Sequence, residues 1–445
     1  LAFTFGLSLL TGIIFGLAPA LQASRPDLVP ALKDEASAAV QGHKRFNLRN
    51  VLVVAQVGLS LVLLIGAGLF LRSLNNAQSI DPGFAADKIL NAQLNINLLR
   101  YTKTQGQQFY GQVLERIEAL PGVESATLAR VVPMSGGGRT SSFLIQGQQG
   151  PDNVNRSEGT GLPDNAYTVN TNVVALKYFT TMAIPLLQGR DFNAQDIEKA
   201  PLATIINQAF ARRYFPDENP IGKRMSFRDA NGPWSEIVGV VHDSKYRTLG
   251  ENPRPSVYVP LAQNHETGMT LHVRAAGNPL SIAGSVRHEV QALDPNLAVT
   301  NIQPLSDVVT ASLFAARMGA VLLAIFGFLA LILAAIGLYG VMSYAVSRRT
   351  REIGIRMALG AGKGNVLRLV LKDGLTLVGA GVTSGVIVAA AATRLLTSFL
   401  YSVSPLDAAT FASIPVVLAL VALLASYFPA RRAAKVDPII ALRYD

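Results

Sequence analysis

Long stretches without charged residues constrain this chain more than any other feature of its sequence. A helix needs about 20 apolar residues to cross the hydrocarbon core of a bilayer, and several uncharged stretches reach or exceed that length. Soluble helices average about 11 residues, so buried helices of a soluble protein are a poor explanation. The content of Leu, Val, Ala and Gly is typical of helices that pack in lipid. The predicted spans are Leu1–Ser24, Asn50–Leu71, Met318–Ser347, Gly374–Thr393 and Ala408–Ala430.

The positions of Lys and Arg predict the orientation of these spans. Regions 25–49, 348–373 and 431–445 together hold about 16 basic and about 7 acidic residues, whereas region 72–317 is nearly balanced. The positive-inside rule places the three basic regions in the cytoplasm and residues 73–316 on the opposite side. This topology explains the net charge of +10. We therefore expect contact with membrane lipid and no nucleic-acid partner.

The large region 73–316 predicts an α+β domain outside the cytoplasm. Helical spacing of Phe109, Val113, Ile117 and Leu120 indicates one helix, and residues rich in β-branched side chains indicate strands. The helix lies far in sequence from the strand near Val240, so we predict two lobes. The fold class is therefore a membrane α-helical bundle plus an α+β extracytoplasmic domain. Further expected elements are strands at 237–241, 269–273 and 297–302, a helix at 282–293, and loops at 135–138 and 146–164.

Two segments that each follow a predicted span repeat one another at a constant offset. Pro19 matches Pro429, Asp27 matches Asp437, and the run from Ala31 to Lys33 matches the run from Ala441 to Arg443. Two unrelated juxtamembrane basic segments would be the plainer explanation, but an ungapped agreement of this length favours a duplication. We expect 1–34 to be the last helix and tail of an upstream unit, 50–72 the first helix of a second unit, 73–316 its large domain, and 317–445 its three remaining helices.

The sequence lacks the usual residue patterns of an enzyme. It contains no cysteine, and its five histidines show no metal-ligand spacing. The run from Gly360 to Gly364 contains Gly-Lys, but Met357 stands where a phosphate-binding loop needs its first glycine, and Gly364 stands where it needs Ser or Thr. We therefore expect no catalytic residues, no cofactor, no metal and no ATPase site within this chain.

The cytoplasmic loop between the third and fourth spans predicts a short helix at 348–359 with two apolar rows. Ile353, Met357 and Ala361 form one row, and Ile355 with Leu359 forms a second row nearly opposite. One interpretation is an amphipathic helix that lies on anionic lipid. The other is a docking helix for a cytoplasmic partner. A two-sided apolar pattern fits the lipid surface poorly and favours the partner.

The run Arg351-Glu-Ile-Gly-Ile-Arg-Met-Ala-Leu-Gly-Ala361 resembles the signature of the MacB/FtsX-like ABC transporter permeases. The order of one span, a large domain and three spans is similar too, and the duplication resembles that of an acidobacterial-type permease subgroup. Unlike MacB itself, this sequence has no fused nucleotide-binding domain. Further runs that resemble the family are Pro429 to Arg443 at the end, and Tyr178-Phe, Leu187 to Phe192, Ile206-Asn-Gln, Tyr214-Phe and Pro220 to Lys223 in a MacB-like periplasmic core domain.

The resemblance implies a permease in the bacterial inner membrane that works by mechanotransmission. A cytoplasmic ABC ATPase dimer would move the cytoplasmic helices, and the long third span would carry the motion to the periplasmic domain for efflux of peptides, antibiotics or lipids. Implied partners also include a second permease half upstream in the same polypeptide, a periplasmic adaptor and an outer-membrane channel. The residues that would enter the ATPase groove are Arg351, Glu352, Ile353, Gly354, Ile355, Arg356, Met357, Ala358, Leu359, Gly360 and Ala361.

Two alternatives remain open at this point. The chain could be an ATP-driven regulator of a cell-envelope enzyme that transports nothing, or a non-ABC membrane receptor that senses a ligand through residues 73–316. An ATPase that associates with the chain would argue against the receptor, and substrate-dependent export would separate a transporter from a regulator. The sequence does not identify the cargo.

Overall fold

The computed structural model describes residues 48–148, 166–228, 231–359, 362–395, 400 and 403–433. The chain divides into two compact units, residues 1–52 and 53–445. Of the first unit only residues 48–52 are described, and they form the start of a helix. The described residues do not include the predicted span Leu1–Ser24, the first repeated segment from Pro19 to Lys33, the second repeated segment from Ala434 onward, residues 149–164 of the predicted loop, or Gly360 with Ala361.

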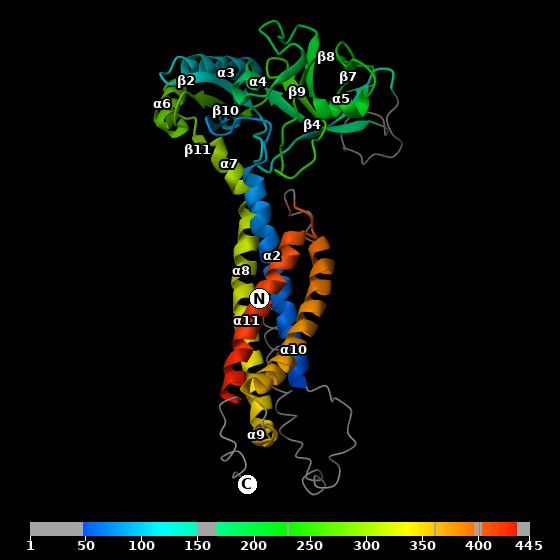
Figure 1. Cartoon of the computed structure of the whole chain (residues 1–445). Coiled ribbons are helices and arrows are strands. Elements are labelled where there is room, and N and C mark those ends of the chain that lie inside the picture. Colours follow the sequence, from blue (N-terminus) through cyan, green and yellow to red (C-terminus); the bar gives the residue numbers. More distant parts are fainter. Residues whose placement is uncertain are drawn as a thin grey trace. The chain divides into compact units, whose positions relative to one another are not determined.

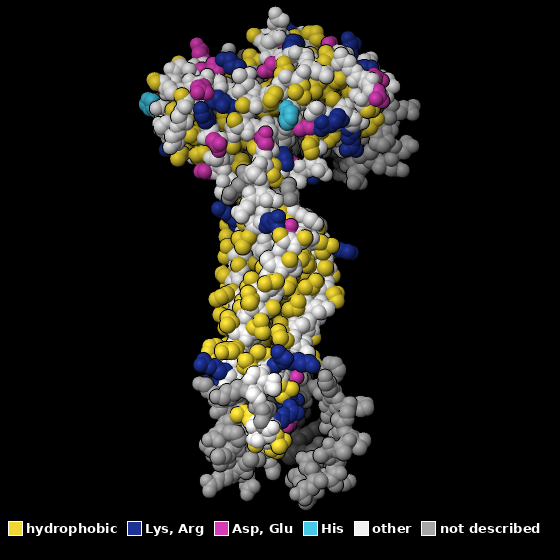
Figure 2. Space-filling model, in the orientation of Figure 1, with side chains coloured by type: hydrophobic (Ala, Val, Ile, Leu, Met, Phe, Trp, Pro, Cys, Tyr) yellow, Lys and Arg dark blue, Asp and Glu magenta, His cyan; other side chains and the backbone are white. Residues whose placement is uncertain are grey.

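The described residues contain four helices that are long and apolar enough to cross a membrane. They confirm the last four of the five predicted spans, each longer than predicted because flanking turns continue the helix. Their lateral surface forms a continuous band of hydrophobic side chains, with Lys and Arg gathered along its lower edge (Figure 2). These helices are α2 (Leu48–Gln78), α8 (Phe314–Arg348), α10 (Lys363–Ala392) and α11 (Ala408–Ala433).

Helices α2 and α10 approach one another to backbone contact through glycine. A Cβ atom added to Gly385 would lie 2.9 Å from the Cα atom of Gly58, and one added to Gly381 would lie 2.6 Å from the Cγ1 atom of Val57. Small residues permit this approach in lipid, where burial of apolar side chains gives no hydrophobic driving force. In the apolar stretch of α2, 44% of the residues are buried, against 17–22% in the apolar stretches of the other three helices.

The first lobe of the periplasmic-type domain is a four-stranded antiparallel sheet with two helices on one face (Figure 1). The chain order is β-α-β-β-α-β and the strand order is β11-β1-β10-β2, which is the ferredoxin-like arrangement. Phe109, Val113 and Ile117 are buried, which confirms the predicted helix. The elements are β1 (Ile89–Asn95), α3 (Lys103–Glu118), β2 (Val123–Ala129), β10 (Gly268–Ala275), α6 (Ala283–Leu293) and β11 (Val299–Pro304), with 3₁₀ turns η2 (Asn97–Leu99) and η3 (Pro279–Ile282).

The second lobe is inserted between β2 and β10 and closes into a six-stranded barrel. Strands pair in the order β4-β3-β7-β8-β6-β9, and a parallel pairing of β9 with β4 completes the ring. Phe143 and Phe210 lie in its core with ring centroids 5.3 Å apart. The two lobes confirm the predicted division. The elements are β3 (Thr140–Ile145), β4 (Tyr167–Val174), α4 (Tyr178–Met182), β5 (Leu186–Gly189), β6 (Leu202–Asn207), α5 (Gln208–Tyr214), β7 (Arg224–Ser226), β8 (Ser235–Val241) and β9 (Ser256–Pro260).

One hydrophobic cluster joins both lobes to the ends of two membrane helices. It contains Phe70 and Ala77 of α2, Ala316 and Ala320 of α8, and buried residues of the domain such as Tyr178. Between the domain and α8 lies α7 (Leu305–Ser312), which packs against β1 and β11. The spans and the domain are therefore connected by packed side chains as well as by the chain.

Candidate functional site

The predicted coupling segment folds as helix α9 (Thr350–Ala358), which lies between α8 and α10. The structure separates the two predicted apolar rows. Ile353 is 2% exposed and belongs to the hydrophobic core of the bundle, with Met357 packed against that core. Ile355 and Leu359 are 44% and 83% exposed. One row therefore anchors the helix and the other remains available for a partner.

Two exposed ion pairs lie beside and within the coupling segment. Arg349, the residue before α9, donates a hydrogen bond from Nη1 to Oδ2 of Asp373 on α10 at 2.8 Å. Within α9, Arg356 and Glu352 form an i,i+4 pair with an N–O distance of 2.6 Å, and both side chains are half exposed. Solvent screens exposed pairs of this kind, so the packed row of Ile353 contributes more to the position of the helix.

Gly354, one of the residues that the family resemblance assigns to the ATPase groove, does not belong to the exposed face of α9. The residue is buried, like its neighbour Ile353. The described residues that a partner can reach are instead Glu352, Ile355, Arg356, Ala358 and Leu359. The pattern of two rows was visible in the sequence, but which row faced outward was not.

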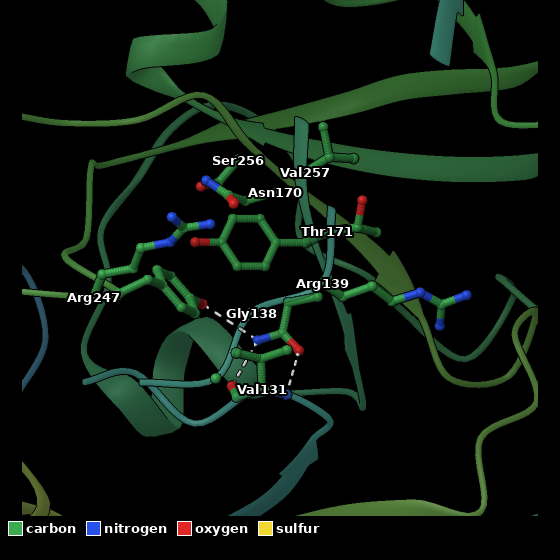
Figure 3. Close-up of a pocket in the computed structure, with 12 residues that line it drawn as sticks. Val131, Gly138, Arg139, Asn170, Thr171, Arg247, Ser256 and Val257 are labelled. Carbon is green, nitrogen blue, oxygen red and sulfur yellow. Dashed lines mark hydrogen bonds between the residues drawn. The ribbon is translucent and has the colours of Figure 1, made fainter. Parts of the chain in front are cut away.

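The periplasmic-type domain encloses a small pocket between the barrel and the segment that follows β2 (Figure 3). Asn172 forms part of its wall through two hydrogen bonds to the backbone of Val131. Its Nδ2 donates to the carbonyl oxygen of Val131 at 3.0 Å, and its Oδ1 accepts from the amide of Val131 at 2.9 Å. Burial raises the pKa of Tyr246 and of Tyr258, so both phenols stay neutral. The pocket has about 20 Å³ of space, which suits about one water molecule and no larger ligand.

Among the described residues, no group of three or more His, Cys, Asp or Glu side chains is arranged to hold a metal ion. His272 is one of the five histidines of the chain. It is fully buried on β10, where its Nδ1 lies 2.7 Å from Oδ1 of Asn91. Burial lowers the pKa of His272 to about 3, so its imidazole is neutral at physiological pH. A neutral, enclosed histidine of this kind serves packing.

Two family models match this chain. The MacB-like periplasmic core domain matches residues 53–291, and the C-terminal region of the FtsX-like permeases matches residues 324–438. Together they cover α9, most of each of the four long helices and both lobes up to α6, while β11 and α7 lie between the two matched regions. Neither matched region is an ATP-binding domain.

Similar proteins include the macrolide export ATP-binding/permease protein MacB of Mannheimia succiniciproducens, which is 24% identical over 409 residues, covering 88% of this chain and 59% of that protein. MacB of Marinobacter nauticus is 26% identical over 295 residues, or 62% of this chain and 43% of that protein. The alignments thus span only about half the length of these relatives. The crystal structure of the periplasmic region of MacB from Actinobacillus actinomycetemcomitans is 13% identical, with a TM-score of 0.35, covering 54% of this chain and 97% of that structure.

Proposed function

The chain belongs to the family of FtsX-like permeases with a MacB-like periplasmic core domain, and on this premise we propose that it transmits force from a cytoplasmic ABC ATPase to its periplasmic domain. It is an inner-membrane permease whose large domain lies in the periplasm. The proposed work is export of peptides, antibiotics or lipids without a channel between the helices.

The observation that carries this proposal is the division of α9 into an anchored and an exposed face. The row of Ile353 packs in the bundle core, so a push on the helix is passed to α8 and α10. The row of Ile355 and Leu359 offers apolar side chains to a partner on the cytoplasmic side. An ATPase dimer that closes when it binds ATP would therefore bind this exposed row and move the membrane helices.

The route from α9 to the periplasm supports the same proposal. Helix α8 has 35 residues, which at 1.5 Å each makes about 52 Å, against about 30 Å for the hydrocarbon core. Its first turns share one hydrophobic cluster with α2 and with the domain. A movement of α8 along its axis would reach the domain through α7, which packs on β1 and β11.

The partners follow from this role. We propose that a cytoplasmic ABC ATPase dimer drives the chain, and its similarity to ATP-binding/permease proteins supports such a partner. We propose that residues 1–34 end an upstream permease half, on the evidence of the repeated segments, and that 50–72, 73–316 and 317–445 form the second half. A periplasmic adaptor and an outer-membrane channel would complete an export route.

A double variant of the exposed row tests the coupling. In Ile355→Asp/Leu359→Asp the buried row is intact, so the chain should insert normally while co-purification of the ATPase falls at least tenfold. The matched control is Leu406→Asp, which alters an exposed leucine just before α11, in the loop predicted to lie on the other side of the membrane. Normal co-purification of the ATPase with the double variant would refute docking through α9.

Export separates transport from regulation of an envelope enzyme. Inverted vesicles that contain the complete complex should accumulate a labelled cargo in an ATP-dependent manner, and the double variant should abolish the accumulation. ATP-dependent activation of a periplasmic hydrolase, with no cargo moved, would favour the regulator instead.

A further inference from the structure

The four-stranded sheet of the first lobe has one face that neither α3 nor α6 covers. Leu90, Ala92 and Leu94 of β1 point into the core beneath the helices, so the alternating residues Asn91 and Gln93 point to the opposite face. This face borders a cleft of about 600 Å³, which the segment between β2 and β3 encloses from the side. The cleft is thirty times larger than the pocket behind Asn172.

The lining of this cleft is polar and unusually rich in amides. Among the described residues, the lining contains four side-chain amides, three hydroxyls, two guanidinium groups, two glycines and three valines, and neither an aromatic nor a carboxylate side chain. The residues are Asn91, Gln93, Arg130, Val131, Val132, Ser135, Gly137, Gly138, Arg139, Thr140, Thr270, Asn301, Gln303 and Val308.

Several of these polar groups lack a partner within the described part of the chain. Asn91 is only 3% exposed, and because its Oδ1 faces His272, its Nδ2 is left without a hydrogen bond. No described group bonds the side chains of Thr140, Thr270 or Gln303 either. An unpaired buried donor is costly, so Asn91 marks a wall of the cleft whose polar groups the described residues do not fully satisfy.

A β-bulge aims one more amide into the cleft. The register of β1 and β11 shifts between Asn91 and Gln93, and Asn301 adopts a left-handed backbone with φ of 50° at that point. Its Nδ2 donates to Oε1 of Gln93 at 2.8 Å, which leaves Nε2 of Gln93 free to donate. Bulges and strained residues of this kind cluster where a side chain must be aimed.

The charge of the cleft is positive. Arg130 and Arg139 both donate to the carboxylate of Glu266, which is 12% exposed on its side chain and does not line the cleft. Two guanidinium groups thus share one carboxylate, and among the described residues no second carboxylate pairs with either of them. A guanidinium group can bind a ligand carboxylate with charge-assisted hydrogen bonds.

We propose that this cleft binds an extended peptide segment that carries an acidic group. Each Asn or Gln side chain presents one acceptor and an NH₂ donor, which match the N–H and C=O of a peptide bond. The two guanidinium groups select a carboxylate. A sugar or a macrolide is disfavoured because no aromatic or broad apolar surface is present for its rings. The binding claim stands apart from force transmission, and only the identification of the peptide as cargo rests on the proposed function.

The test uses the full chain in lipid nanodiscs without an ATPase, so that failure of coupling cannot affect it. The probe is a pool of fluorescein-labelled, C-terminally amidated heptapeptides with a fixed central glutamate among Gly, Ser, Asn and Ala. A second pool has glutamine at the centre. Fluorescence anisotropy should show binding of the glutamate pool at least tenfold tighter than of the glutamine pool, with the difference falling as salt is added.

Variants assign this preference to the cleft. Arg130→Gln/Arg139→Gln should abolish the preference, Arg130→Lys/Arg139→Lys should keep most of it, and Glu266→Gln should increase it severalfold by freeing both guanidinium groups. Gln303→Leu should weaken both pools alike. The matched control is Arg116→Gln on α3, whose ion pair with Glu289 at 3.6 Å lies on the helix-covered face of the sheet. Equal binding of both pools, or a preference that survives the double Gln variant, would overturn the proposal.

A photo-crosslinking residue at Gln303 in native membranes distinguishes the source of the peptide. A crosslink to a small free peptide that ATP removes would identify cargo, and a crosslink to a segment of a resident periplasmic protein would identify a partner. A crosslink only to another permease half would show that the cleft is a protein interface, and the proposal would fail.

Discussion

The periplasmic domain and the membrane bundle are held together by opposite kinds of residue. In the domain the largest enclosed side chains are aromatic, and Phe143 and Tyr178 are fully buried. In the bundle, Gly58, Gly381 and Gly385 make the contact between α2 and α10. In water a large apolar side chain gains free energy by burial, whereas in lipid it gains nothing over its surroundings.

The two regions should therefore tolerate different kinds of substitution. The domain should lose stability when a large side chain is replaced by a small one, because a cavity forms. The bundle should suffer when a small side chain becomes larger, because the helices must separate.

Phe143→Ala should destabilise the barrel by about 3–5 kcal/mol, since it removes a buried ring that touches Phe210 and Tyr214. The fluorescence of Trp234, the single tryptophan of the chain, reports unfolding of this lobe just before β8. The matched control is Leu187→Ala on the exposed side of β5, which should change the stability by less than about 1 kcal/mol. Equal effects of both variants would contradict the aromatic core.

Gly385→Ala should destabilise the bundle by up to about 3 kcal/mol, because the new Cβ meets the backbone of Gly58 at 2.9 Å. The measurement is the fraction of full chain that remains monodisperse on gel filtration after heating in detergent. Gly379→Ala on the same helix is the control, since its Cβ would meet nothing within 4 Å. If the Gly385 variant were as stable as the Gly379 variant, α2 and α10 would not pack through glycine.

Acid should destabilise the first lobe by about 2 kcal/mol between pH 7 and pH 5 through His272. Burial lowers its pKa from 6.5 to about 3, so in this window the unfolded chain binds a proton that the folded chain cannot. Stability is therefore complete above pH 6.5 and falls as the pH falls toward 3. His272→Gln should flatten this dependence when unfolding is followed by circular dichroism. An unchanged slope would mean that His272 accepts a proton in the fold.

Glu352→Gln should have the smallest effect, at most about 0.5 kcal/mol, because the pair with Arg356 is exposed and contributes about 0.2–0.5 kcal/mol to a helix. The thermal midpoint and the inserted amount should equal those of the unmodified chain. A large loss of folded protein would show that α9 depends on this pair rather than on the anchoring row of Ile353.

Local patterns in the sequence predicted the elements better than their assembly. The four described spans follow from uncharged length alone, and β8 and β10 follow from runs such as Ile237–Val241. The closure of the barrel could not be predicted, because the pairing of β4 with β9 joins residues more than 80 positions apart and leaves no local signal. The insertion of one lobe within the other was invisible for the same reason.

The site was predicted only where it is local. The two rows of α9 could be read from their spacing, but their burial depends on helices α8 and α10. The cleft brings together Gln93, Arg139 and Gln303, which no short motif connects. Only the flexible run Ser135–Gly138 marked part of its wall in advance.

The insertion of the barrel also determines the order in which paired strands are synthesised. Strand β2 ends at Ala129, and its partner β10 begins at Gly268, so about 140 residues separate two neighbours in one sheet. At 5–20 residues per second, translation alone delays their meeting by on the order of ten seconds. The barrel strands are all encoded within that interval, so their partners are synthesised before β10. During each round of synthesis, the lobe that binds α7 therefore remains incomplete, with β1 unpaired and β2 without its partner β10, until the barrel residues have been translocated.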